Sequence, residues 1–116
     1  MNEDLKTLHE QLVAQHEALF AKLDTAPDDE AMDTILTEMR ELRHRIDIVQ
    51  GLLFRETTAA LKSSLQKVGD ADAELTKALS FAASATDLVK GVSKFLAVVD
   101  KAIDLAKTLA PLAAGI

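Results

Sequence analysis

The sequence predicts an all-α protein whose helices pack as an antiparallel bundle. Apolar residues recur at steps of three and four along most of the chain, which is the spacing of one helix face. No segment alternates apolar and polar residues, and no Asn-Gly or Asp-Gly hairpin turn occurs. The 116 residues, 48% of them apolar, suit one small globular domain, residues 1–116, and exclude a disordered chain.

The first helix is expected over about residues 3–23. Asn2 is a suitable N-cap, and Glu3 and Asp4 follow where the helix dipole favours negative charge. One apolar stripe runs along this helix and indicates that a single face is buried. Its members are Leu5, Leu8, Leu12, Leu19, Phe20 and Leu23.

A second helix is expected over about residues 29–68. Pro27 interrupts the chain before it, with Thr25 and Asp28 as alternative caps. A heptad repeat follows, which is typical of a coiled-coil seam. It comprises Met32, Ile35, Met39, Leu42, Ile46, Val49 and Leu53. The apolar line then shifts by one position, which the drift of a straight helix explains; a break at Gly51 is the alternative.

A turn is expected at Gly69 and Asp70, followed by a third helix over about 71–110 and a tail over 111–116. Gly69 suits the left-handed position after a helix, and Asp70 suits the N-cap of the next one. Pro111 ends the third helix. A connection this short makes the second and third helices an antiparallel hairpin.

The three expected helices differ in length, and this difference predicts self-association. The second and third helices would each be about 60 Å long, and the first half of that. Residues 51–88 would then extend beyond the first helix with large apolar side chains uncovered, which usually marks an interface. We therefore expect a homodimer or homotetramer in which these arms form a coiled-coil-like four-helix bundle. The expected interface residues are Phe54, Leu61, Leu65, Phe81, Ala82 and Leu88.

A fold-back of the long hairpin is the alternative to self-association. Gly51 and Gly91 would lie nearly opposite each other, about 20 residues from the expected turn. If both glycines broke their helices, the arm would fold onto the body as a compact five-helix monomer.

The sequence carries no arrangement that indicates catalysis. The chain has no cysteine, which excludes disulfides and thiolate metal sites, and it has no glycine-rich phosphate loop. His9 and His16 are one heptad apart, about 10 Å along a helix and too far to share a metal ion. We therefore expect no enzymatic activity, no cofactor and no metal site.

Charge argues against nucleic acid as a partner. The net charge is −6, and the chain has no Tyr or Trp to stack on bases. All four arginines lie within residues 40–55, where acidic residues interleave with them. The first 30 residues carry an excess of acid, and we expect these acids to meet the arginines across the helices.

These observations predict a non-enzymatic protein–protein interaction module of the adaptor, chaperone or inhibitor type. The acidic N-terminus is unlike a secretory signal, and no apolar run reaches the length of a membrane span, so a cytoplasmic protein is expected. The alternative is a peripheral membrane protein that uses its amphipathic third helix, with lysines at 90, 94, 101 and 107. Heptads and an alanine-rich helix are too generic to indicate a family.

Overall fold

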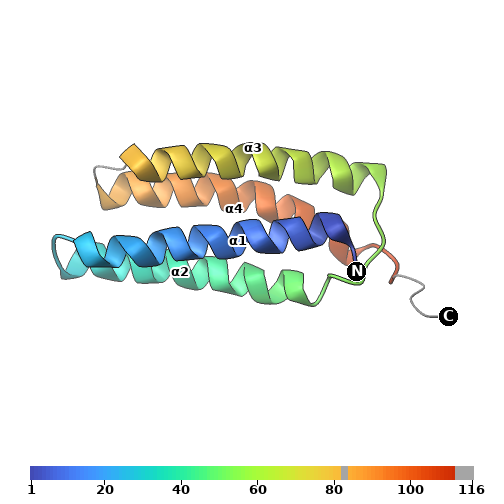
Figure 1. Ribbon diagram of the computed structural model, residues 1–116, viewed down its shortest axis with the longest axis horizontal. Helices are drawn as coiled ribbons and strands as arrows, with labels where there is room; N and C mark the ends of the chain where they lie inside the picture. The colour runs from blue at the N-terminus through green and yellow to red at the C-terminus, as the bar shows by residue number, and fades with distance from the viewer. Residues whose placement is uncertain (82–83, 112–116) are drawn as a thin grey trace.

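The computed structural model describes residues 1–81 and 84–111, and in these residues the protein is an all-α bundle of four helices. Successive helices run in opposite directions along a body with extents of 54 × 21 × 17 Å (Figure 1). The elements are α1 (Glu3–Lys22), the short 3-10 helix η1 (Leu23–Thr25), α2 (Asp29–Gln50), α3 (Ala59–Phe81) and α4 (Ala85–Lys107).

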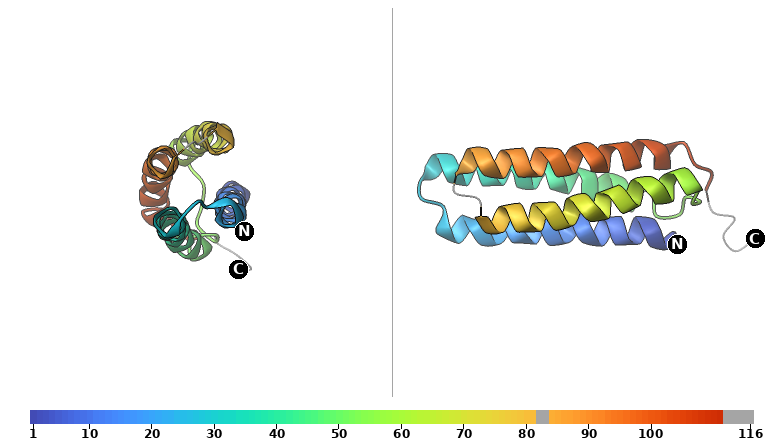
Figure 2. Two further views of the ribbon diagram at one scale, coloured as in Figure 1. Left: turned by 90° about the vertical axis from the view of Figure 1, so that its left-hand side faces the viewer. Right: turned by 90° about the horizontal axis from the view of Figure 1, so that it is seen from above.

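The four helices form two hairpins that lie against each other. The α1–α2 and α3–α4 pairs pack extensively, and smaller α1–α3 and α2–α4 contacts join the two pairs. Seen along the bundle, the helices surround a common interior (Figure 2, left). The face formed by α3 and α4 therefore lies opposite the face formed by α1 and α2.

All four helices contribute an apolar stripe to one continuous core. Burying a large aliphatic or aromatic side chain stabilises a fold by about 1.5–3 kcal/mol. The largest side chains that are fully buried are Leu5, Leu8, Leu12 and Leu19 of α1, Leu42 and Val49 of α2, Leu61, Val68 and Leu75 of α3, and Phe95, Val92 and Val99 of α4.

Side chains cap the helix starts, as helix termini require. Asn2 caps α1, as the sequence predicts, by accepting from the backbone N–H groups of Asp4 and Leu5. Asp28 rather than Thr25 caps α2, through the N–H of Ala31.

The expected second helix is wrong beyond Gln50. The helix α2 ends there, Gly51 is its C-cap, and the chain folds back before α3 begins at Ala59. The predicted turn at Gly69 and Asp70 is also wrong, because both residues lie inside α3. A single glycine within a helix costs only about 1 kcal/mol relative to alanine, and the buried stripe of α3 continues through this position from Val68 to Leu75.

The expected third helix, over about 71–110, is not one helix, because residues 71–81 belong to α3 and residues 85–107 belong to a separate helix. The helix α4 begins at Ala85, and Ser84 caps it by accepting from the N–H of Asp87. Gly91 causes no break. A Cβ at this position would lie 3.3 Å from Leu75 Cδ1 and 3.7 Å from Ala78 Cβ, so glycine lets α4 approach α3 closely.

The uncovered arm inferred from the sequence therefore does not exist. The four helices have 20, 22, 23 and 23 residues, and each lies beside two others along the bundle. The break at Gly51 belongs to the fold-back alternative, whereas its second break at Gly91 does not occur. The result is four helices of nearly equal length rather than three or five.

Hydrogen bonds hold the connection between α2 and α3 at one end of the bundle. The Asn2 backbone N–H donates to Leu53 O at 2.7 Å, and its side-chain Nδ2 donates to Arg55 O at 3.0 Å. Arg55 Nη1 donates to Leu109 O, and the Glu56 N–H donates to Ala110 O, each at 2.8 Å. Residues before α1, between α2 and α3, and after α4 are thus tied together.

Candidate functional site

Of the six residues expected to form an interface, the five that the structure describes do not lie together on the surface. Leu61 and Leu88 are buried in the core and do not present their side chains to a partner, and Leu65 is half-buried against it. Phe54 and Phe81 are exposed, by 58% and 77%. Phe54 lies in the connection that precedes α3, and Phe81 ends α3, so they occupy opposite ends of the bundle (Figure 1). Ala82 lies outside the described residues.

A groove runs along the outer side of α3 and α4, and we name it the α3/α4 groove. One part, of about 540 Å³, lies between Ala71, Ala78 and Phe81 of α3 and Gly91 and Val98 of α4. A second part, of about 650 Å³, lies between the segment 60–67 of α3 and the segment 98–105 of α4. Val98 borders both parts.

Small residues at helical spacing make this surface hollow. Ala60, Ser64, Ala71 and Ala78 follow at steps of four, seven and seven, so they share one face of α3. Their short side chains leave a depression beside α4, where Gly91 contributes no side chain at all. The lining residue Phe81 stands as a large aromatic side chain at the end of the groove.

The groove is more basic than the protein as a whole. Its first part carries Lys77 and Lys94 against Glu74. Its second part carries Lys67 and Lys101 against Asp104. Each part thus has two lysines and one acid, in a chain whose net charge is −6.

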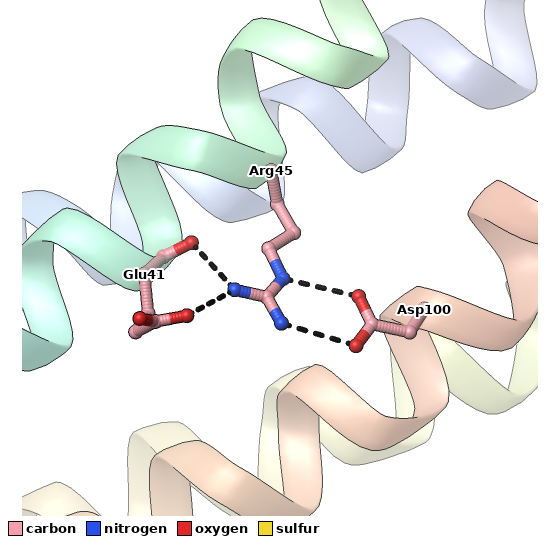
Figure 3. A network of polar contacts seen from close by, with 3 residues as sticks. All are labelled: Glu41, Arg45 and Asp100. Carbon is pink, nitrogen blue, oxygen red and sulfur yellow. Dashed lines mark hydrogen bonds and ion pairs between the residues drawn. The ribbon is translucent and has the colours of Figure 1, made fainter.

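An ion-pair network joins the two hairpins between α2 and α4 (Figure 3). Arg45 Nε and Nη2 donate to the two carboxylate oxygens of Asp100 at 3.0 and 3.1 Å, and Nη1 donates to Glu41. The hydrogen bond to Asp100 is the main reason why the pKa of Arg45 is raised. The expectation that the N-terminal acids meet the arginines is wrong for Arg45, because its partners lie on α2 and α4.

Glu38 lies on the same side of α2 and is 9% exposed. Burial raises the pKa of its carboxyl group, the negative charge of Glu41 raises it further, and Arg45 opposes the shift. The junction between α2 and α4 therefore includes one carboxylate that the fold does not stabilise in its charged form.

A buried glutamine joins the hairpins on the opposite side, between α1 and α3. Gln15 Nε2 donates to Asp72 Oδ1 at 2.9 Å and to Thr76 Oγ1 at 2.8 Å. Gln15 Oε1 is buried without a hydrogen-bond partner. Both junctions between hairpins thus carry polar contacts beside the apolar core that all four helices share.

In the described part of the chain, residues 1–81 and 84–111, no group of three or more His, Cys, Asp or Glu side chains is placed to hold a metal ion. No helix among these residues combines the length and apolar character needed to cross a membrane.

Comparison with known proteins adds no relative. No protein family, curated protein or solved structure matches this chain. The groove's shape, side chains and charge therefore carry the functional proposal.

Proposed function

We propose that this protein is a non-enzymatic protein–protein interaction module and that the α3/α4 groove is its binding surface. The observation that carries the proposal is the groove itself, which is about 30 Å long at 1.5 Å per residue over residues 60–81. Apolar surface rimmed by polar residues is typical of an interaction site. An open channel between two parallel or antiparallel helices suits a third helix laid along it.

The chemistry of the groove supports binding rather than catalysis. Its polar side chains are lysines, carboxylates and the hydroxyls of Ser63 and Ser64, and the groove lining includes no histidine. An adaptor, a chaperone or an inhibitor would use such a surface, since each needs complementary shape more than a reactive group.

Self-association stays part of this proposal in a changed form. The homodimer or homotetramer expected from the sequence depends on exposed apolar surface, and Leu61 and Leu88 do not supply it. Among the described residues, Phe54 and Phe81 are the exposed members of the expected set, and such contact would depend on them.

Site-specific photo-crosslinking in cells of the native host tests the proposal. A photoreactive amino acid replaces Lys77, which is exposed at the groove, and in a matched variant it replaces Lys6, which is exposed on α1. We expect discrete protein adducts from position 77 only. The absence of adducts at position 77, or the same adducts at both positions, would contradict the proposal.

The lipid-binding alternative requires the bundle to open. The apolar face of α4 is buried against the other helices, from Leu88 through Phe95 to Ala106. Because that face belongs to the continuous core, opening would expose buried apolar side chains, which contact with lipid would have to cover. Flotation with anionic vesicles tests it. Binding that is lost when Lys90, Lys94 and Lys101 are changed to Glu would favour lipid, and no flotation would remove this alternative.

A further inference from the structure

We infer that the α3/α4 groove binds an acidic amphipathic helix of another protein, which places two apolar side chains in the two parts of the groove. This inference rests on the proposed function and names the class of partner.

The shape of the groove sets the length and pattern of the bound helix. The centres of its two parts are about 19 Å apart along α3 and about 11 Å apart along α4, at 1.5 Å per residue. A helix presents side chains on one face at seven residues, about 10 Å, and at eleven residues, about 16 Å. The partner therefore needs about four turns, with large apolar residues at i and i+7 or at i and i+11.

The small residues that line the groove let such a helix approach closely. Packed helices lie about 8–10 Å apart, and small side chains at the contact favour the shorter distance. Ala71, Ala78 and Gly91 line the first part, where Phe81 offers an aromatic surface at its end. The partner's large side chains would fill the hollows that these residues leave.

The positive charge of the groove indicates a negatively charged partner. Lysines rim both parts, Lys77 and Lys94 in the first and Lys67 and Lys101 in the second. An acidic helix would place carboxylates beside them along its whole length, and complementary charge also speeds association. A symmetric dimer through the same groove would instead bring these lysines towards the lysines of the second copy. The charge pattern thus favours a different, acidic partner over self-association through this face.

A displayed peptide library tests the inference without a known partner. Helical peptides of about 18 residues, four to five turns of helix, vary at both apolar and charged positions and are selected on the full-length protein. Peptides that also bind the Ala78→Trp variant, whose groove is filled, are discarded. We expect enrichment of acidic peptides with apolar residues at i and i+7 or i+11. Enrichment of basic or uncharged peptides, of other apolar spacings, or of nothing would overturn the inference.

Charge reversal gives the second measurement, on the best enriched peptide. The double change Lys94→Glu and Lys101→Glu is expected to weaken binding by about tenfold or more, because each reversal turns attraction into repulsion. The matched control reverses two lysines of α1, Lys6→Glu and Lys22→Glu, and is expected to change binding by less than about twofold at moderate salt. Equal effects of the two pairs would contradict the inference. Circular dichroism establishes that each variant is folded.

The outcomes separate this inference from the proposed function. If a natural partner crosslinks at Lys77 but its crosslinked segment is not acidic, the interaction module stands and the partner class is wrong. A light-scattering mass of two chains that falls to one chain in Ala78→Trp would assign the groove to a second copy and overturn the inference. If neither crosslinking nor selection yields a binder, both proposals are contradicted.

Discussion

Asn2 shows how much one side chain near the chain end contributes to this fold. It is 7% exposed and bonds with both α1 and the α2–α3 connection. We expect Asn2→Ala to lower the free energy of unfolding by about 1–3 kcal/mol, because it removes a cap and leaves buried partners unpaired. Urea denaturation measures the loss.

The aspartate variant separates the two roles of Asn2. Asn2→Asp keeps the oxygen that accepts from Asp4 and Leu5 but removes the donor to Arg55 O and Thr57 Oγ1. It should therefore lose stability while keeping the cap. A loss below about 0.5 kcal/mol for Asn2→Ala would show that the observed bonds do not stabilise the fold, since that is the usual scatter for surface changes.

The raised pKa of Glu38 determines how its contribution to the free energy of unfolding changes with pH. Between the ordinary glutamate pKa and the raised folded value, the folded state binds more protons than the unfolded state. This group's contribution to stability is therefore favourable at low pH and falls as the pH rises through that interval. We expect Glu38→Gln to be more stable than the parent protein at pH 7 and to lose this advantage below the ordinary glutamate pKa.

Denaturation curves across the acid range test this expectation. Glu10→Gln is the matched control, because Glu10 is exposed on α1. Its difference from the parent protein should stay small at every pH. An advantage of Glu38→Gln that does not change with pH would exclude the buried carboxyl as its cause.

At the scale of the element, glycines that look alike in sequence have different roles. Gly69 lies within α3, and the nearest atom to an added Cβ is 3.9 Å away, so alanine fits. We expect Gly69→Ala to stabilise the protein by about 0.5–1 kcal/mol. Gly91→Ala should gain less or lose stability, because its Cβ would lie 3.3 Å from Leu75 Cδ1.

Thermal unfolding of the two variants checks both expectations. If Gly69 instead ended a helix in a turn, Gly69→Ala would destabilise the protein, because alanine is strained in the left-handed conformation that a helix-ending glycine adopts. Destabilisation by Gly69→Ala together with stabilisation by Gly91→Ala would contradict the helix bounds.

Local signals explain which elements the sequence predicts and which it does not. The start of α1 follows from capping chemistry within a few residues, whereas the break at Gly51 and the cap at Asp28 are each one of two alternatives that local chemistry leaves open. Gly69-Asp70 carries the same local chemistry, but the buried stripe of α3 overrides it. The true connection over 51–58 depends instead on bonds to Asn2, Leu109 and Ala110, which are distant in sequence and leave no local pattern.

The sequence alone contains one part of the candidate site, the repeat of small residues, but not the groove that they line. The repeat of small residues along α3 is visible there, from Ala60 to Ala78. To see that this face borders α4 with a groove between them, one must know that α3 ends at Phe81 and α4 begins at Ala85, whereas the predicted hairpin turned at Gly69. The same displaced turn explains why Leu61 and Leu88 were expected on the surface, because it left these core residues apparently uncovered.

At the scale of the molecule, a disulfide tests which helices are neighbours. The chain has no cysteine, and a Cβ at position 91 would lie 3.7 Å from Ala78 Cβ, close to the typical disulfide value. We expect Ala78→Cys with Gly91→Cys to form a bridge on oxidation and to raise stability by about 3 kcal/mol for a loop of this size. Gel mobility with and without reductant detects the bridge.

A control variant, Ala60→Cys with Ala78→Cys, tests the long hairpin that the sequence predicts. With a turn at Gly69, Ala60 would lie near Ala78; in α3 they are about 27 Å apart along one helix. Ala60→Cys with Ala78→Cys should therefore not form an intramolecular bridge. Ready closure of this pair would restore the long hairpin and remove the groove.

Arg55 brings the first and last described segments of the chain together at one end of the bundle. Its carbonyl accepts from Asn2, and its backbone pairs with Pro111. A force that pulls Asn2 and Pro111 apart would therefore strain the contacts of Arg55 before it reaches the opposite end of the bundle, where Phe81 lies.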